Sequence, residues 1–312
     1  MVDGKNQWKA WLYLAPAIIL LLIFTAWPIV NTLIMAFTND YNALESIGGD
    51  VQYSSGFKNF YHVVADNGSP FWNCLKNTLL LCVFTVPVST ILALLIAVCL
   101  NAIKPLQKVL QTIFFLPYVT NTIAIGMVFA VMFNVVGVNS PTESIGLINN
   151  IIVFFGGERI DWLGITSEPW ANYVVLIIYI VWNALPFKIL ILLGGLQSVN
   201  KQYYDAAKID GTSRIRTFWR ITVPMLSPML AYVIITGFIG GFKEYSSVVG
   251  IFGAKMGPAS DKGRMNTIVG MIYDSINSEN YGYASAAALI LFVIILLVTL
   301  LNLYVSKKKV HY

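Results

Sequence analysis

The segment YASAAALILFVIILLVTLLNLYV, residues 283–305, runs for 23 residues without a charged side chain. A helix needs about 20 apolar residues to cross the hydrocarbon core of a bilayer. Lipid offers no hydrogen-bond partner to an open backbone, so a segment this apolar crosses it as a helix. The stretch therefore predicts a membrane-spanning helix, and the segments that accompany it decide the fold class.

Five other segments are long, apolar and almost free of charge. The chain of 312 residues is 57% hydrophobic and only 11% charged, whereas soluble domains carry about a quarter charged residues. The sequence thus predicts an all-α integral membrane protein whose 312 residues form a single domain. Its six predicted transmembrane helices are residues 11–37, 77–101, 109–133, 170–193, 229–250 and 283–305.

Basic residues indicate how these helices are oriented. With the N-terminus placed in the cytoplasm, twelve of the 20 Lys and Arg residues fall on the cytoplasmic side, five outside, and three within or beside helices. This bias follows the positive-inside rule, so both termini are expected to be cytoplasmic. It also accounts for the net charge of +5 without nucleic acid. Lys5 and Lys9 precede an apolar run too long for a cleaved signal peptide, so we expect that run to be retained.

Two further features bear on what the helices surround. Pro28, Pro87, Pro117 and Pro186 lie inside four predicted helices, where proline removes a backbone hydrogen bond and favours a kink. These kinks either have no special role or shape the helices into the bent wall of a cavity. The outer connections 38–76, 134–169 and 251–282 are long, and long loops are often functional. They are candidates for the surface that binds an extracellular partner.

One cytoplasmic connection stands apart, YYDAAKIDGTSRIRTFWRITVPMLSP at residues 203–228. Gly211 is suited to end a helix in a left-handed conformation, and Thr212 or Ser213 can cap a second helix. The stretch predicts a helix–turn–helix with apolar and basic side chains at the inner membrane face. The residues alone leave open whether it lies on acidic lipid or binds a protein.

This connection resembles the EAA loop of binding-protein-dependent ABC importers, with the approximate pattern E-A-A-x-x-D-G-A, then F-x-x-I-x-L-P-x-x-x-P. Asp205, Thr212 and Val223 depart from it, replacing Glu, Ala and Leu. The resemblance extends over nearly the whole chain to permeases of the maltose and multiple-sugar type, for example at Leu116-Pro117-Tyr118 and at residues 195–198. The matching loop positions are Ala206, Ala207, Asp210, Gly211, Phe218, Ile221, Pro224 and Pro228.

The resemblance implies a type I ABC importer permease fold with a cytoplasmic coupling loop. The chain is then the transmembrane subunit of an ATP-driven carbohydrate importer, with oligosaccharides as the expected cargo, in the inner membrane of a bacterium. It implies a second, different permease subunit, two ATPase subunits that bind ATP and Mg, and an extracellular or periplasmic sugar-binding protein. The implied ATPase-docking residues are Asp205, Ala206, Ala207, Asp210, Gly211, Phe218 and Pro224.

The resemblance also implies a substrate pocket on the third to fifth helices. Most of its positions are small or carry hydroxyl or amide groups, which suits sugar hydroxyls, and an aromatic ring there can stack on a pyranose. Lys188 is expected to pair with a carboxylate of the second permease. The implied substrate-binding residues are Tyr118, Thr122, Asn183, Ala184, Gly237, Gly241, Glu244 and Ser246.

Other functions remain as alternatives. Related permeases import glycerol phosphate or polyamines, and a secondary transporter would show an internal repeat and a midplane carboxylate, for which only Glu244 is a candidate. The chain has no G-x-x-x-x-G-K-[ST] phosphate loop, so we expect a non-catalytic subunit without a cofactor of its own. With His62 and His311 as the only histidines and no CxxC pair, neither a metal site nor an active site is expected.

Overall fold

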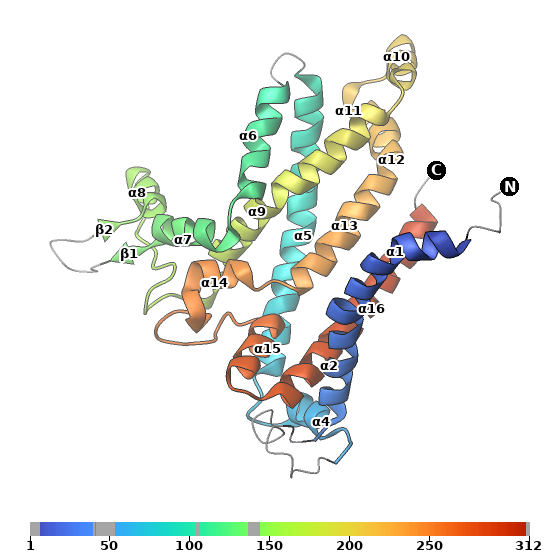
Figure 1. The fold of residues 1–312 in the computed structure, drawn as a ribbon. Coiled ribbons are helices and arrows are strands. Elements are labelled where there is room, and N and C mark those ends of the chain that lie inside the picture. Colours follow the sequence, from blue (N-terminus) through green and yellow to red (C-terminus); the bar gives the residue numbers. More distant parts are fainter. Residues whose placement is uncertain (1–6, 40, 42–53, 104–106, 137–143, 310–312) are drawn as a thin grey trace. The chain divides into compact units, whose positions relative to one another are not determined.

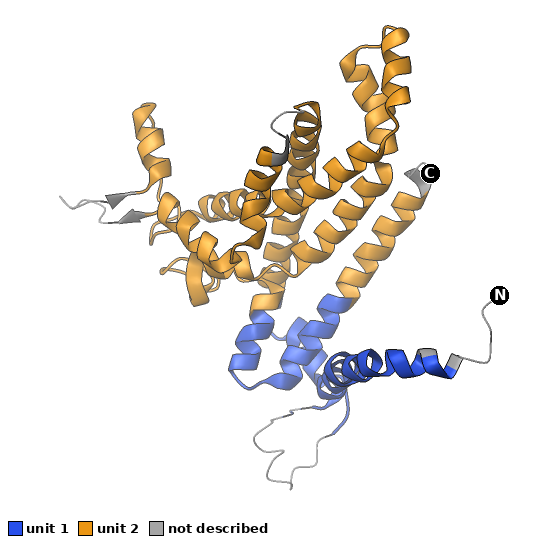
Figure 2. Cartoon of the chain, turned by 45° about the horizontal axis from the view of Figure 1, so that its top comes forward, with its two compact units in different colours: residues 1–71, 271–292 blue, residues 72–270, 293–312 orange. Residues whose placement is uncertain are grey.

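The computed structural model describes residues 7–39, 41, 54–103, 107–136 and 144–309 (Figure 1). The predicted cytoplasmic termini, residues 1–6 and 310–312, and the basic residue Lys104 lie outside this part. Contacts divide the chain into two compact units, residues 1–71 with 271–292 and residues 72–270 with 293–312 (Figure 2). The single permease domain expected for residues 1–312 stays a prediction.

The first unit begins with a long helical segment that contains a π-helical turn. The turn Leu22–Ala26 lies between α1 and α2. Proline clashes with the carbonyl four residues before it, and for Pro28 that residue, Phe24, lies inside the turn, where the wider π spacing relieves the clash. The helices of this unit, two of which continue into the other unit, are α1 (Gln7–Leu21), α2 (Trp27–Phe37), α4 (Lys58–Ala65), α15 (Ile268–Asn277) and α16 (Tyr281–Lys309).

Hydrogen bonds from the side chain of Asn59 connect α4 to the end of α2. Its side-chain amide donates to the carbonyls of Met35, Ala36 and Thr38 at 3.4, 3.1 and 2.9 Å. These carbonyls lie at the end of a helix, where the regular N–H donors four residues further along the chain are missing. The side chain of Asn59 therefore both caps α2 and sets the direction of the chain that follows.

The second unit contains the remaining helices and one short antiparallel ladder, in which Val135 pairs with Ile145 and Val136 with Ser144. The fold is thus helical, as predicted. The elements are α5 (Phe71–Ala102), α6 (Gln107–Val119), α7 (Thr122–Phe133), β1 (Val135–Val136), β2 (Ser144–Ile145), α8 (Leu147–Phe154), α9 (Pro169–Ser198), α10 (Lys201–Ile209), α11 (Arg214–Thr217), a π-helical turn (Phe218–Thr222), α12 (Val223–Met225), α13 (Ser227–Phe242), α14 (Ser246–Phe252) and a 3-10 turn (Gly253–Lys255).

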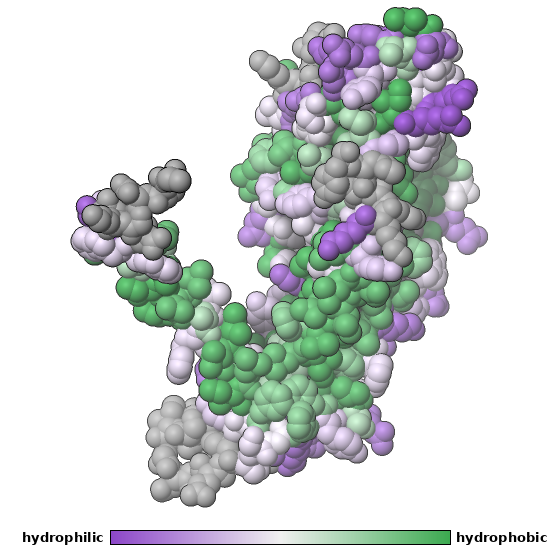
Figure 3. Space-filling model, turned by 90° about the vertical axis from the view of Figure 1, so that its right-hand side faces the viewer, coloured by the Kyte–Doolittle hydropathy of each residue, from purple (hydrophilic) through white to green (hydrophobic). Residues whose placement is uncertain are grey.

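Among the described residues, four helices are long and apolar enough to cross a membrane alone, and the number rises to six if each of two bent helix pairs counts as one span. The single spans are Trp11–Phe37, Phe71–Ala102, Pro169–Ser198 and Tyr281–Lys307. They agree with the predicted helices, although most begin earlier or end later. Large apolar side chains are exposed along them, and hydrophobic residues cover a broad area of the face in Figure 3, as expected of a surface that meets lipid.

The third predicted helix, residues 109–133, is wrong as a single helix. It consists of α6 and α7, which meet at an angle of 98°. The side chain of Asn121 accepts from the backbone N–H groups of Ile123 and Ala124 at 2.9 and 3.2 Å. This N-cap satisfies donors at the start of a new helix, so the backbone can turn within an apolar segment.

The fifth predicted helix, residues 229–250, is also broken. Helix α13 ends at Phe242 and α14 begins at Ser246, with Lys243 and Glu244 between them. Glu244 Oε1 accepts from the backbone N–H of Ser247 at 3.0 Å, which again supplies a partner for a donor that the break exposes. Both charged residues therefore lie at a discontinuity and not inside a regular helix.

Two glycines allow α7 and α14 to pack backbone against backbone. A Cβ atom at Gly126 would lie 2.7 Å from the Cα atom of Gly250, and one at Gly250 would lie 3.0 Å from that of Gly126. Small residues bring helices close together in membranes. This contact holds the α13–α14 break beside the α6–α7 bend (Figure 1).

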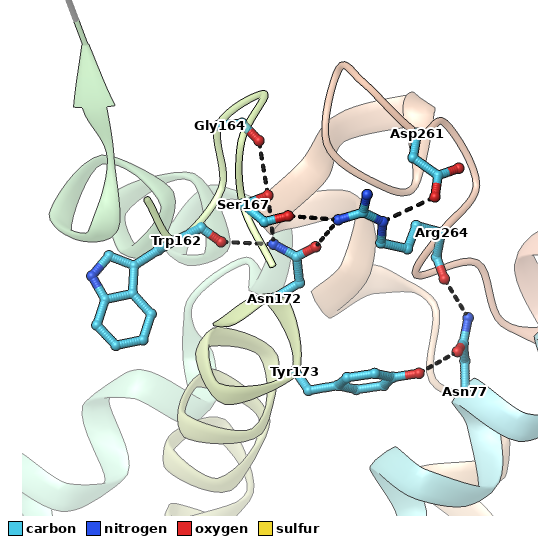
Figure 4. A network of polar contacts seen from close by, with 8 residues as sticks. All are labelled: Asn77, Trp162, Gly164, Ser167, Asn172, Tyr173, Asp261 and Arg264. Atoms are coloured by element: carbon cyan, nitrogen blue, oxygen red, sulfur yellow. Dashed lines mark hydrogen bonds and ion pairs between the residues drawn. The ribbon is translucent and has the colours of Figure 1, made fainter. Parts of the chain in front are cut away.

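A polar network fixes the loop after α14 to the starts of α5 and α9 (Figure 4). Arg264 donates to the carbonyl of Ser167 at 2.8 Å and to Asp261 at 3.0 Å. The amide of Asn77 donates to the carbonyls of Arg264 and Asn266, both at 2.8 Å. Because these bonds join three segments far apart in the sequence, they fix the framework around the helices that form the site.

Candidate functional site

A cavity of about 310 Å³ lies among α5, α6, α9 and α13. Its walls combine aromatic rings, hydroxyl groups, an amide, a glycine-rich helix face and two side chains of opposite charge. The lining residues are Thr85, Val86, Ser89, Tyr118, Ile180, Asn183, Ala184, Phe187, Lys188, Thr236, Gly237, Gly240, Gly241 and Glu244.

Six of the eight predicted substrate-binding residues line this cavity: Tyr118, Asn183, Ala184, Gly237, Gly241 and Glu244. Thr122 and Ser246 do not line it. They are the first residues of α7 and α14, and the carbonyl of Thr122 accepts a hydrogen bond from the hydroxyl of Tyr179. The two thus lie at the breaks beside the cavity. The binding role of all eight stays a prediction.

Two aromatic rings form one wall. The rings of Tyr118 and Phe187 are stacked, with centroids 5.9 Å apart and planes at 19°. Tyr118 occupies the last turn of α6, so the break at Asn121 leaves its ring half exposed. A flat, apolar face of this kind can pack against the C–H face of a sugar ring, and the phenol can still form a hydrogen bond.

Lys188 reaches the cavity wall from the middle of α9 and is only 4% exposed. Its Nζ atom donates to the carbonyl of Val86 at 3.2 Å, to Ser89 Oγ at 2.7 Å and to Thr90 Oγ1 at 2.9 Å. An ammonium group has three donors, and all three find acceptors in α5 of the same chain. The structure thus provides a set of partners other than the carboxylate expected from a second permease.

Sequence reasoning missed the hydroxyl groups of the cavity. Thr85 and Ser89 lie one helical turn apart in α5, and Thr236 precedes Gly237 in α13. Hydroxyl residues one turn apart in an otherwise apolar segment were the available signal, because such residues share a helix face. Hydropathy alone does not reveal it, since the hydroxyls of Ser89 and Thr236 donate to carbonyls of their own helices and add little polarity.

A larger cavity of about 350 Å³ lies between α13 and the end of α16. Apolar side chains of Leu230, Ile234, Ile235 and Val305 dominate its lining, and its few polar residues include Asn302. Asn302 already donates to the carbonyl of Val298 at 3.0 Å. A polar ligand therefore finds more partners in the cavity at Lys188 and Glu244.

The predicted helix–turn–helix is formed by α10, Gly211 and α11. Gly211 has a φ of +65°; its N–H donates to the carbonyl of Lys208 at 3.1 Å, and that of Thr212 to the carbonyl of Ala207 at 2.9 Å. These two bonds form a Schellman motif, which ends helices at a left-handed glycine. Ser213 caps the second helix through the N–H of Arg216, so the predicted turn and one of the two candidate caps are confirmed.

The loop presents apolar side chains at its surface. Ile209, Ile215 and Trp219 are 87%, 74% and 63% exposed, while Ala207 is buried and Phe218 and Pro224 are partly buried. Asp205 forms an exposed ion pair with Lys208 at 3.0 Å, which contributes little stability. The carboxylate thus lies on the loop surface, and the exposed apolar residues extend the predicted docking set.

Comparisons with known proteins cover nearly the whole chain. The lactose transport system permease protein LacF of Rhizobium radiobacter is 30% identical, with 96% of this chain and 95% of the relative aligned. The arabinooligosaccharides transport system permease protein AraP of Bacillus subtilis is 28% identical, with coverages of 95% and 88%. Homology therefore extends from the first helix to the last.

A solved structure shows the same fold. A chain of a bacterial ABC transporter involved in the import of the acidic polysaccharide alginate superposes with a TM-score of 0.78. The match covers 98% of this chain and 97% of that one at 23% identity. The arrangement of helices is thus that of an ABC importer permease.

A family profile gives the assignment. The profile described as "Binding-protein-dependent transport system inner membrane component" matches residues 87–311, which include the second half of α5, the cavity helices α6, α9 and α13, the helix–turn–helix and the last span. The chain therefore belongs to the family of binding-protein-dependent transport system inner membrane components.

Proposed function

We propose that this chain is the membrane-spanning permease subunit of an ATP-driven carbohydrate importer whose cargo is an oligosaccharide. One observation carries the proposal: the chain is 30% identical to a lactose permease over 96% of its length. The relative named for arabinooligosaccharides supports the same cargo class. A glycerol phosphate importer and a secondary transporter, the earlier alternatives, have no comparable support.

The cavity at Tyr118 and Asn183 is the proposed sugar site of this subunit. A sugar presents hydroxyl groups at its edge and C–H groups on its faces. The stacked rings of Tyr118 and Phe187 suit the faces, while the amide of Asn183 both donates and accepts. The glycine-rich face at Gly237, Gly240 and Gly241 lines the same cavity, and a Cβ atom at Gly240 would meet nothing within 4 Å, which leaves space for a sugar ring.

The helix–turn–helix is the proposed contact with a separate ATPase. Asp205, Ala206, Ala207, Asp210, Gly211, Phe218 and Pro224 are the proposed docking residues, together with the exposed Ile209 and Ile215. ATP and Mg are bound by the partner, so this chain contributes motion and not catalysis. Closure of two ATPase subunits would push the loop, and α12 and α13 continue from it directly toward the cavity.

The remaining partners follow from the same assignment. A second, different permease subunit supplies the other half of the path, and an extracellular or periplasmic sugar-binding protein delivers the cargo. Both termini of this multi-pass protein lie in the cytoplasm of a bacterium. The family description, which names an inner membrane and a binding protein, supports this arrangement.

Uptake by the purified complex tests the proposal. The tagged chain is isolated with its partner subunits, reconstituted in liposomes, and assayed for ATP-dependent uptake across a panel of oligosaccharides. We expect at least one sugar to accumulate and to stimulate ATP hydrolysis. Accumulation of glycerol phosphate, with no response to any sugar, would contradict the proposed cargo.

Asn183→Ala gives a residue-level readout in the same assay. Losing one hydrogen bond to a sugar should raise the half-saturating concentration about fivefold to tenfold. Asn302→Ala, in the larger apolar cavity, is the matched control and should leave that concentration unchanged. Equal effects of the two substitutions would contradict the assignment of the sugar site to the cavity at Asn183.

A further inference from the structure

The larger cavity is a groove between the bend that joins α12 to α13 and the last turns of α16, all within the second unit. We propose that one acyl chain of an anionic phospholipid fills this groove, that Arg220 and Lys307 hold its headgroup, and that the bound lipid helps the helix–turn–helix to move α13. The lipid site goes beyond the proposed sugar import and does not depend on the cargo. Its effect on coupling rests on the proposed contact with an ATPase.

The walls of the groove suit a hydrocarbon chain. Seven of its ten lining residues are apolar, and the others are two serines and Asn302, whose amide already donates to the carbonyl of Val298 at 3.0 Å. Ser227 begins α13, and Ser306 lies in the last turn of α16. The hydroxyl groups therefore lie at the end of the groove nearer the helix–turn–helix, and the walls beyond them are apolar, which matches the two parts of a phospholipid.

The groove lies in a part of the chain that can cross the membrane. The last span is Tyr281–Lys307, while Arg214–Met225 and Ser227–Phe242 form a pair bent by 68°. Pro224 lies before this bend and Leu230 after it, and both line the groove. An unfilled groove would leave its walls without van der Waals partners. Inside a bilayer, the molecules at hand to fill it are lipids and the helices of a partner subunit.

The width of the groove favours a lipid chain over a helix. From Ser227 to Ile235 the groove follows α13, a length of about 12 Å at 1.5 Å per residue. Spread over that length, its volume of about 350 Å³ gives a cross-section of about 30 Å², whereas a helix about 10 Å across needs about 80 Å². A single hydrocarbon chain fits this space, and a whole helix does not.

Two cations flank the end of the groove that carries the serines. Arg220 precedes Pro224 by one helical turn, and Lys307 directly follows Ser306. Both are exposed, and within the described part of the chain neither takes part in a salt bridge. They are therefore available to an anionic group at the mouth of the groove.

No acidic residue offsets this charge along the segments that form the groove. Residues 211–243 and 282–312 contain no Asp or Glu, and the second segment includes the lysine run 307–309. Basic pockets between membrane helices bind anionic lipid headgroups on the cytoplasmic side, which is the side proposed for this loop. The charge thus favours an anionic phospholipid over a neutral one and over an apolar side chain of a partner subunit.

The position of the groove connects lipid binding with coupling. Pro224 is one of the proposed docking residues, and Leu226, at the bend itself, is only 1% exposed. A push on the loop can either change the angle of the bend or carry α13 with it. A chain packed against both sides of the bend resists a change of angle, because close-packed groups transmit strain. More of the push then reaches α13.

Photolabelling tests the lipid site. The purified complex is placed in phosphatidylcholine nanodiscs with a small fraction of phosphatidylglycerol that carries a diazirine near the end of one acyl chain. We expect the label on α13 between residues 230 and 235. Arg220→Gln and Lys307→Gln should each weaken this labelling about fivefold, and the double variant about tenfold or more. Lys201→Gln, an exposed cation of α10 outside the groove, is the matched control and should not change it.

Ala231→Trp tests the groove independently of charge. The indole would occupy the apolar part, so labelling of α13 should disappear while the complex stays assembled. Loss of the second permease from this variant, with α13 unlabelled in the unaltered protein, would assign the groove to a partner subunit. Equal labelling of the double charge variant and Lys201→Gln would also overturn the lipid site.

The effect on coupling is measured as sugar transported per ATP hydrolysed in liposomes with and without phosphatidylglycerol. We expect this ratio to rise about twofold or more with the anionic lipid, and not to rise in the double charge variant. An equal ratio in both membranes would contradict the effect on coupling. Because photolabelling needs no sugar, a complex that transports none would contradict sugar import and leave the lipid site standing.

Discussion

Gly211 is the residue at which the chain reverses between α10 and α11. Its φ of +65° is open to glycine and strained by about 1–2 kcal/mol in most other residues. A Cβ atom at this position would meet nothing within 4 Å, so the requirement is conformational and not steric. We expect Gly211→Ala to uncouple ATP hydrolysis from uptake, measured as sugar transported per ATP hydrolysed by the reconstituted complex.

Gly211→Asn is the informative companion, because asparagine tolerates the left-handed region better than alanine. It should retain more of the coupling than Gly211→Ala, although its side chain is larger. If the larger residue were the more damaging, the glycine would matter for close contact with the ATPase and not for the turn. Unchanged uptake in Gly211→Ala would contradict both a role of the glycine in the turn and a role in close contact with the ATPase.

Lys188 shows how a charge is accommodated inside an apolar helix. Its acceptors Ser89 and Thr90 also donate to carbonyls of their own helix, so removing the amine leaves neither hydroxyl without a partner. An apolar side chain of similar size also avoids the cost of desolvating a buried charge. We expect Lys188→Met to assemble with its partner subunits and to change the unfolding temperature of the complex by only a few degrees.

Lys188→Glu provides the contrast. A carboxylate would face the carbonyl of Val86 and could not donate to it, so assembly should fail or the unfolding temperature should fall strongly. If Lys188→Met instead prevented the second permease from binding, the lysine would serve a carboxylate of that subunit, as the sequence led us to expect.

At the scale of elements, the contact between α7 and α14 depends on glycine at both positions. The atoms nearest a Cβ atom at Gly126 are backbone atoms of Gly250, which cannot rotate away. Gly126→Ala should therefore destabilise the protein by about 1–3 kcal/mol through overpacking, seen as earlier thermal unfolding in detergent. Gly194→Ala, in α9 with nothing within 4 Å, is the control and should be neutral or slightly stabilising. Equal losses in both would refute a specific close approach.

Hydropathy predicted the spans because their composition is set by lipid, but it could not predict where they break. Residues 109–133 read as one helix, yet the side chain of Asn121 caps a new helix and allows the 98° bend. A single asparagine barely changes the mean hydropathy of 25 residues. The cap depends on local backbone geometry, which is visible in the sequence only as an asparagine four residues after Pro117.

The sequence predicted some of the cavity residues but not all of them. Asn183 and Tyr118 came from a family resemblance, and the structure brings them into one cavity. Thr122 and Ser246 do not join them, because each begins a helix just beyond a break that the sequence did not reveal. Thr85 and Thr236 were missed because the pairing of α5 with α13 is a tertiary property, which no single helix encodes.

At the scale of the whole molecule, the proposed function requires the helix–turn–helix and the loop around Arg264 to face opposite sides of the membrane. One span, α13, separates them in sequence. Lys208 and Lys262 are both exposed, and neither belongs to the proposed sugar cavity. They are therefore suitable positions for reporters of the side to which each loop is exposed.

Cysteine labelling decides the orientation. Cys74, Cys82 and Cys99 are first replaced by alanine, and Lys208→Cys or Lys262→Cys is added to that background. In intact cells with a permeable outer envelope, a membrane-impermeant maleimide should label the cysteine at position 262 and not that at 208; in inverted vesicles the pattern should reverse. The expectation follows from the excess of Lys and Arg on the side of the helix–turn–helix. Labelling of position 208 from outside would place the loop away from any cytoplasmic ATPase, and the coupling role proposed for Gly211 would fail with it.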